Sequence, residues 1–180
     1  MEAGLILTLV LLGISSVTSP DAVKTLVRLR TTESAVQELI GDGQRRSATF
    51  AALVDTIERS HTFVYVARVH RLPHAMEGCL VNDGDGSPVR YLRVLLAIGT
   101  PRERMIVVLA HEFQHVAEVL AAGIVNDRGA VDALFNRIGS RTLGSNTSEQ
   151  YETVAAQRVM AAVDRELHSR VASGVKWRKE

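Results

Sequence analysis

Cysteine is almost absent from this chain of 180 residues, because Cys79 is the only one. A single cysteine excludes an intrachain disulfide framework and any zinc site built on several thiolates. A metal site would therefore have to use His, Asp or Glu side chains. An excess of charge is also missing, since 21 Lys and Arg stand against 20 Asp and Glu, for a net charge of +1. This balance gives no strong field toward nucleic acid, so we expect no nucleic-acid partner.

Internal repeats, low-complexity tracts and long Pro/Gly linkers are missing too. The chain contains 46% hydrophobic and 23% charged residues, which is ordinary for one compact globular domain. We therefore predict a single domain over residues 20–180.

The N-terminal apolar run, residues 4–14, is shorter than the roughly 20 residues that a transmembrane helix needs. Its length is that of the hydrophobic region of a signal peptide, and small residues follow at Val17-Thr18-Ser19. We predict that residues 1–19 are a signal peptide and that the protein is exported to the periplasm or the cell exterior, with no stable membrane span after its removal. The alternative is a hydrophobic N-terminal helix that is buried in the protein or associates it with a membrane.

The remaining periodicity predicts an α+β fold with segregated helices and strands. A break at Gly41-Asp42-Gly43 separates the first two predicted helices, and Asp-Gly pairs predict a tight turn at 82–87. The predicted helices cover residues 33–40, 48–59, 102–122, 128–138 and 148–171. The predicted strands cover residues 62–69, 78–81 and 89–98.

The most informative motif is His111-Glu112-Phe113-Gln114-His115, an HExxH sequence inside the apolar stretch 105–120. Residues four apart lie on one face of a helix, so both imidazoles can bind one Zn²⁺. Glu112 lies on the adjoining flank, where its carboxylate can take a proton from a metal-bound water. The sequence thus predicts a zinc site with Glu112 as the catalytic base.

A catalytic zinc normally has three protein ligands, so a third is expected. Glu118 and Ala121 stand where the HExxHxxGxxH pattern has its glycine and its third histidine, which excludes that class. Glu118 could bind the same metal as both histidines only under strain. We favour Glu152, near the start of the last predicted helix, where small alanines follow, and Glu149 one turn earlier is its rival.

The combination of HExxH with Glu152-Thr153-Val154-Ala155-Ala156 resembles the gluzincin branch of the zincin metallopeptidases, over about residues 88–160. The resemblance implies a zincin-like fold, in which a short antiparallel or mixed sheet of about three strands packs on the active-site helix. It implies His111, His115 and Glu152 as ligands of Zn²⁺ and Glu112 as general base and proton shuttle.

The same resemblance implies hydrolysis of a peptide or protein substrate. The predicted strand at 90–97 looks like the edge strand that pairs with extended substrate in that family. A Tyr or His that donates to the oxyanion is also implied, and five candidates stay open: Tyr65, Tyr91, Tyr151, His74 and His168. Acceptors for the zinc histidines are expected, with Asp127 and Asp132 as possibilities.

Two other functions are compatible with the sequence. A di-iron carboxylate protein could use the ExxH units Glu112/His115 and Glu58/His61 together with Glu33 and Glu152, but His61 adjoins a predicted strand, whereas ferritin-like bundles need each unit inside a long helix. The other is a secreted, zincin-shaped binding protein without catalysis, which would not need Glu112.

Overall fold

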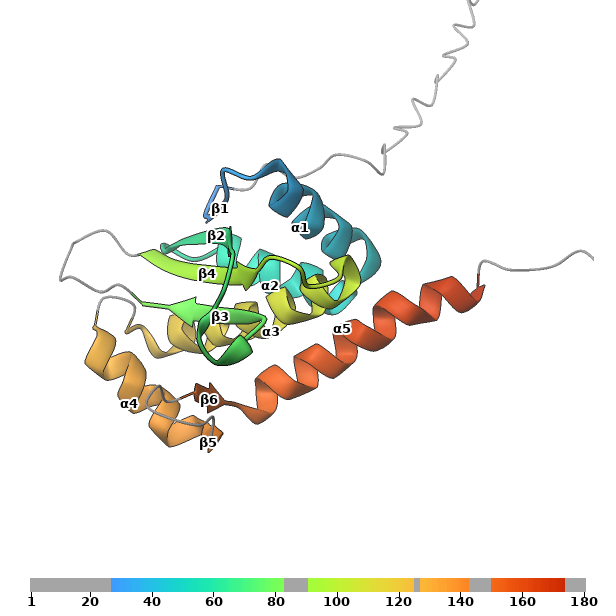
Figure 1. The fold of residues 1–180 in the computed structure, drawn as a ribbon. Helices are drawn as coiled ribbons and strands as arrows, with labels where there is room; N and C mark the ends of the chain where they lie inside the picture. The colour runs from blue at the N-terminus through green and yellow to red at the C-terminus, as the bar shows by residue number, and fades with distance from the viewer. Residues whose placement is uncertain (1–26, 83–90, 125–126, 143–149, 174–180) are drawn as a thin grey trace, which may run out of the picture.

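The computed structural model describes residues 27–82, 91–124, 127–142 and 150–173 (Figure 1). The predicted signal peptide, residues 83–87 of the predicted turn and Glu149 lie outside the described residues. The elements in chain order are β1 (Leu29–Arg30), α1 (Ser34–Arg46), α2 (Ala48–Glu58), β2 (Phe63–Val69), the 3₁₀ helix η1 (Pro73–Ala75), β3 (Gly78–Val81), β4 (Tyr91–Ala97), α3 (Arg102–Ala122), α4 (Arg128–Ile138), β5 (Ser140–Thr142), β6 (Gln150–Glu152) and α5 (Val154–Ser173).

The main sheet has four strands in the order β1-β2-β4-β3. The strands β1, β2 and β4 are parallel, whereas β3 runs antiparallel to β4 with Cys79 opposite Leu95. The strands β5 and β6 pair separately as an antiparallel hairpin, with Ser140 opposite Glu152. The fold is therefore α+β with a small mixed sheet, as the sequence predicts at that level.

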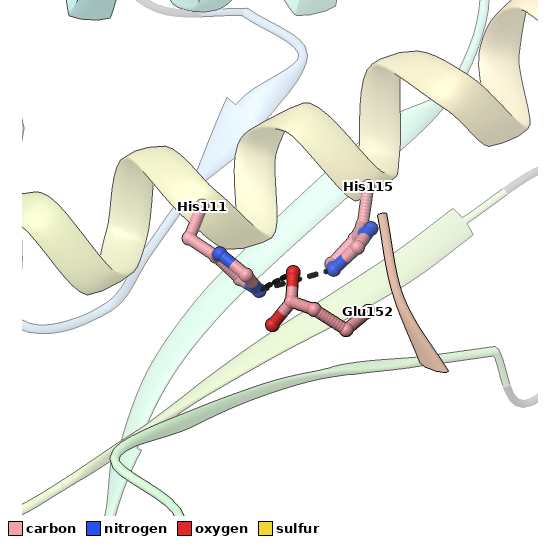
Figure 2. A group of neighbouring side chains, drawn as sticks. All are labelled: His111, His115 and Glu152. Carbon is pink, nitrogen blue, oxygen red and sulfur yellow. Dashed lines mark hydrogen bonds and ion pairs between the residues drawn. The ribbon is translucent and has the colours of Figure 1, made fainter. Parts of the chain in front are cut away.

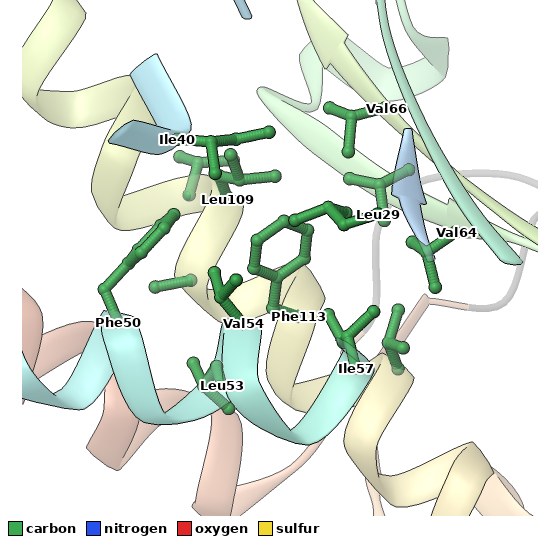
Figure 3. Packing of buried hydrophobic residues seen from close by; sticks show 14 of the residues in the cluster. Leu29, Ile40, Phe50, Leu53, Val54, Ile57, Val64, Val66, Leu109 and Phe113 are labelled. Atoms are coloured by element: carbon green, nitrogen blue, oxygen red, sulfur yellow. The ribbon is translucent and has the colours of Figure 1, made fainter. Parts of the chain in front are cut away.

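The core lies between one face of the main sheet and the helices (Figure 3). Alternate residues of β2 and β4 point toward it, so that Val64, Val66, Leu92 and Val94 are almost fully buried. The ring of Phe113 on α3 packs against that of Phe50 on α2, with 5.6 Å between the ring centroids.

Helix α3 has contacts with the other four α-helices and with β3 and β4. By length and composition it is the one helix of the described residues that could cross a membrane. More than half of its most apolar stretch is nevertheless buried inside the protein. Its contacts with the core account for its apolar character.

Most predicted elements are confirmed to within a few residues, including α2, α3, α4 and the strands β2, β3 and β4. The predicted break at Gly41-Asp42-Gly43 is wrong, because α1 runs through it to Arg46. A Cβ on Gly43 would lie 2.9 Å from the ring of Phe50, so this glycine gives close helix packing instead of ending the helix. An interior glycine costs a helix only about 1 kcal/mol, which such packing can offset.

Two predictions near the motif helix are also wrong. The strand predicted as the sheet edge, now β4, lies between β2 and β3, and β3 forms the edge. The last helix begins at Val154 rather than at residue 148, because residues 150–152 form β6. Glu152 therefore lies on a strand and not on a helix.

Two carboxylates of the alternative di-iron set, Glu58 and Glu33, hold the N-terminal elements together. Glu58 accepts hydrogen bonds from the backbone N–H groups of residues 27–29, which ties β1 to the end of α2. Glu33 accepts hydrogen bonds from the backbone N–H and the guanidinium of Arg68 on β2, both at 2.7 Å. The pKa of Glu33 lies below its ordinary value. The hydrogen bond from the backbone N–H lowers it most, the guanidinium lowers it further, and burial opposes both.

Replacing Glu33 with Gln should reduce the free energy of unfolding at pH 7 by about 1 kcal/mol, since the contact is charge-assisted but partly exposed. A lowered pKa means that this stabilisation is complete above the ordinary value of 4.5 and is lost as pH falls through the lowered pKa. The difference between wild type and Glu33→Gln should therefore shrink below pH 4.5 in urea titrations. Glu38→Gln, at an exposed position on α1, the helix that Glu33 precedes, is the control. A difference that stays constant down to pH 3 would contradict this role.

Candidate metal centre

The two motif histidines lie one turn apart on α3, with their rings pointing to the same place (Figure 2). The Nε2 atoms of His111 and His115 are 3.1 Å apart. Their side chains are only 14% and 8% exposed. The helix therefore presents both nitrogens at one buried position, as the four-residue spacing predicts.

Glu152 reaches the same position from β6 (Figure 2). Its Oε1 atom lies 3.7 Å from Nε2 of His111. The ligand atoms of His111, His115 and Glu152 all lie within 4.8 Å of one another. No other group of three or more His, Cys, Asp or Glu residues in the described ranges is arranged to hold one metal ion.

The three side chains fit a zinc ion in both spacing and chemistry. In a tetrahedral site with bonds of 2.0–2.1 Å, ligand atoms are about 3.3 Å apart, close to the distances of 3.1 and 3.7 Å found here. Two imidazoles and one carboxylate are a common donor set of catalytic zinc. Oε1 of Glu152 is also buried without a hydrogen-bond partner among the described residues, which is costly unless a cation compensates it.

The two histidines differ in their proton affinity. Burial, and then the charge of His115, lower the pKa of His111 to about 4, so its Nε2 can offer a lone pair at neutral pH. Burial also lowers the pKa of His115, but the hydrogen bond to Glu118 and the charges of nearby carboxylates outweigh it and raise that pKa. The difference follows from the contact of His115 with Glu118, because the pKa of His111 is lowered chiefly by burial.

Glu112 lies beside this group and is 6% exposed. The pKa of its carboxyl is raised to about 7, chiefly by burial. The charge of Glu152 also raises this pKa, whereas the charge of His115 and a backbone hydrogen bond from Leu80 lower it. A carboxyl with a pKa near neutrality can both accept and return a proton at neutral pH.

The edge strand β3 approaches Glu112 closely because it begins with a glycine. A Cβ on Gly78 would lie 2.6 Å from Cγ1 of Val108 and 3.1 Å from Oε1 of Glu112. Any side chain at this position would push the strand away from α3. Sequence reasoning missed Gly78, although a glycine in a predicted strand, here at its first position, is a signal of close backbone approach.

Glu118 contacts a motif histidine, a role for which the sequence suggested Asp127 and Asp132 instead. Its Oε2 lies 3.0 Å from Nδ1 of His115, and its Oε1 accepts a hydrogen bond of 2.7 Å from the hydroxyl of Thr153. The expected acceptors Asp127 and Asp132 are elsewhere, because Asp127 caps the N-terminus of α4 and Asp132 is exposed on that helix.

Four of the five candidates for an oxyanion donor lie apart from the cluster of His111, His115 and Glu152. Tyr65 and Tyr91 alternate with buried residues of β2 and β4, so they point to the sheet face away from α3. His168 is 63% exposed on α5 beside Asp164, and His74 is in η1.

Tyr151 is the candidate nearest to the cluster, because it precedes Glu152 in β6. Its ring stacks on Phe135, and the ring of Phe135 meets His115 edge-on at 5.2 Å between centroids. This places an aromatic wall on one side of His115.

The di-iron set is not brought together. Glu33 and Glu58 make the contacts with Arg68 and with residues 27–29 described above, and His61 is exposed two residues before β2. Among the described residues, only Glu152 joins His111 and His115 in a possible metal group.

No protein-family model matches this chain, and comparisons with curated proteins and with solved structures returned no match.

Proposed function

We propose that this protein is a zinc-dependent peptidase, in which His111, His115 and Glu152 hold Zn²⁺ and Glu112 is the general base. The observation that carries the proposal is the convergence of two histidine Nε2 atoms with a buried oxygen of Glu152 that has no hydrogen-bond partner among the described residues. A bound zinc ion would polarise the scissile carbonyl and make a water molecule more acidic.

Glu112 is placed to move the proton of the reaction. Its carboxylate accepts a proton as the water oxygen bonds to the carbonyl carbon, and it returns that proton to the nitrogen as the C–N bond breaks. The backbone hydrogen bond from Leu80 holds the carboxylate at the sheet edge, and burial keeps its pKa near 7. Water and peptide are thereby converted into a carboxylic acid and an amine, with no net change in Glu112.

The edge strand β3 supports a peptide as the substrate. The carbonyl of Glu77 accepts a hydrogen bond from the N–H of Ala97, so the backbone groups of Gly78, one residue on, point away from β4. An extended chain can pair with such an edge, next to Glu112. We therefore propose β3, and not the predicted strand 90–97, as the strand that pairs with an extended substrate.

Mass spectrometry of the purified full chain should find about one zinc per molecule. His115→Ala and Glu152→Ala should each lose that zinc, because either change removes one of three ligands. The controls His61→Ala and Glu38→Ala remove exposed side chains of the same types and should keep it. Two irons per chain would favour the di-iron alternative, and absence of metal from the wild type would overturn the proposal.

Glu112→Gln should keep the zinc but reduce kcat/KM about 10² to 10⁴-fold, since the amide cannot accept the proton. A peptide library with free and blocked ends, read by mass spectrometry, measures the cleavage. A zinc-loaded wild type that cleaves none of these peptides would indicate the non-catalytic binding protein instead.

Gly78→Ala should reduce kcat/KM about 10 to 100-fold without changing the zinc content. The added methyl group would overlap Val108 and displace β3 from Glu112, whereas the ligands lie on α3 and β6. Gly129→Ala is the matched control, because its Cβ would meet only Asp127 at an ordinary 3.4 Å. Full activity of Gly78→Ala would show that the position of β3 is unimportant for catalysis.

A further inference from the structure

Glu118 connects the two elements that carry the proposed ligands. One carboxylate oxygen contacts Nδ1 of His115 on the same helix at 3.0 Å, and the other accepts a hydrogen bond of 2.7 Å from the hydroxyl of Thr153. Thr153 directly follows Glu152 and is 2% exposed, while the side chain of Glu118 is 10% exposed. The link therefore runs through the protein interior, where hydrogen bonds to a charged group are strong.

The position of Glu118 rules it out as a ligand of the same metal in this arrangement. It contacts Nδ1 of His115, whereas the ring presents Nε2 to His111. A carboxylate that accepts a hydrogen bond from Nδ1–H keeps the proton on Nδ1 and leaves the lone pair of the neutral ring on Nε2. Glu118 thus selects the tautomer of His115 that can bind at the shared position.

Thr153 fixes the other half of the site. Besides donating to Glu118, its hydroxyl oxygen accepts the backbone N–H of Ala156 at 3.1 Å, in the first turn of α5. The same residue thereby caps α5 and fastens the end of β6 to α3. Glu152, its neighbour in the chain, is held beside His111 by this attachment.

We propose that Glu118 and Thr153 are positioning residues: Glu118 fixes His115 as the Nδ1-protonated tautomer, and its bond to Thr153 holds Glu152 against α3. The assignment rests on the proposed zinc site for its purpose, but the two contacts can be tested in protein without metal.

The first experiment measures the tautomer of His115 by ¹⁵N NMR of the full chain, freed of metal with a chelator. It is made at a pH above which the ¹⁵N shifts of the ring no longer change, so that the ring is neutral. Wild type should show Nδ1 protonated. Glu118→Ala should give a mixture of both tautomers or the Nε2-protonated form, and Glu118→Gln, which keeps an acceptor oxygen, should largely restore the wild-type signal. A wild-type ring protonated on Nε2, or an unchanged spectrum in Glu118→Ala, would overturn the assignment.

The second experiment measures zinc affinity by competition with a chromophoric chelator. Glu118→Ala and Thr153→Val should each weaken binding about 10 to 100-fold, the usual effect of losing a group that orients a ligand. Thr153→Ser keeps the hydroxyl and should retain most of the affinity. The double variant should bind zinc almost as well as the single variant with the lower affinity, because both substitutions break the same hydrogen bond between Glu118 and Thr153.

A helix cap elsewhere separates positioning from simple loss of stability. Ser47 caps α2 through the N–H of Phe50, away from the histidines. Ser47→Ala should lower Tm without changing zinc affinity. Equal affinities in wild type, Glu118→Ala and Thr153→Val would overturn the positioning role while leaving the zinc site in place. Conversely, a wild type that binds no zinc but whose His115 tautomer depends on Glu118 would refute the proposed function and support the tautomer assignment.

Discussion

The burial of α3 is the constraint on which the rest of the structure depends. Ile106, Leu109 and Phe113 are fully buried. Figure 3 shows Leu109 and Phe113 among side chains of the sheet and of α2. Because an α-helix repeats every 3.6 residues, this apolar stripe forces His111 and His115 to the opposite side. Glu112 falls between the two sides, next to the sheet edge. The packing of this apolar stripe therefore separates the side of α3 that carries the proposed metal ligands from the position of the proposed base.

The same burial destabilises the charged forms of the acidic side chains near the histidines. Burial raises the pKa of Glu112 to about 7 and also raises that of Glu152, which means that their charged forms are destabilised. A divalent cation at the proposed site would favour the charged form of Glu152 and provide a partner for its buried oxygen. Metal binding and the docking of the β5–β6 hairpin would then stabilise each other.

The local elements could be predicted because their signals are local. The apolar spacing in α3 and the β-branched run in β2 depend on neighbours a few residues away. The break expected at Gly41-Asp42-Gly43 failed because the need to pack Gly43 against Phe50 outweighed the low helix propensity of glycine. The strand β1 was missed because two residues carry too little periodicity to be recognised.

The sequence by itself determined the pairing of His111 with His115 and the flanking place of Glu112, since helix geometry alone relates residues one and four apart. It also indicated Glu152 as the partner, although on a helix and not on a strand. Only the tertiary structure decided that β3 is the sheet edge, that Gly78 brings it to Glu112, and that Glu118 bonds both His115 and Thr153. Each of these joins segments that are distant in the chain, and no local pattern specifies which distant segments pack together.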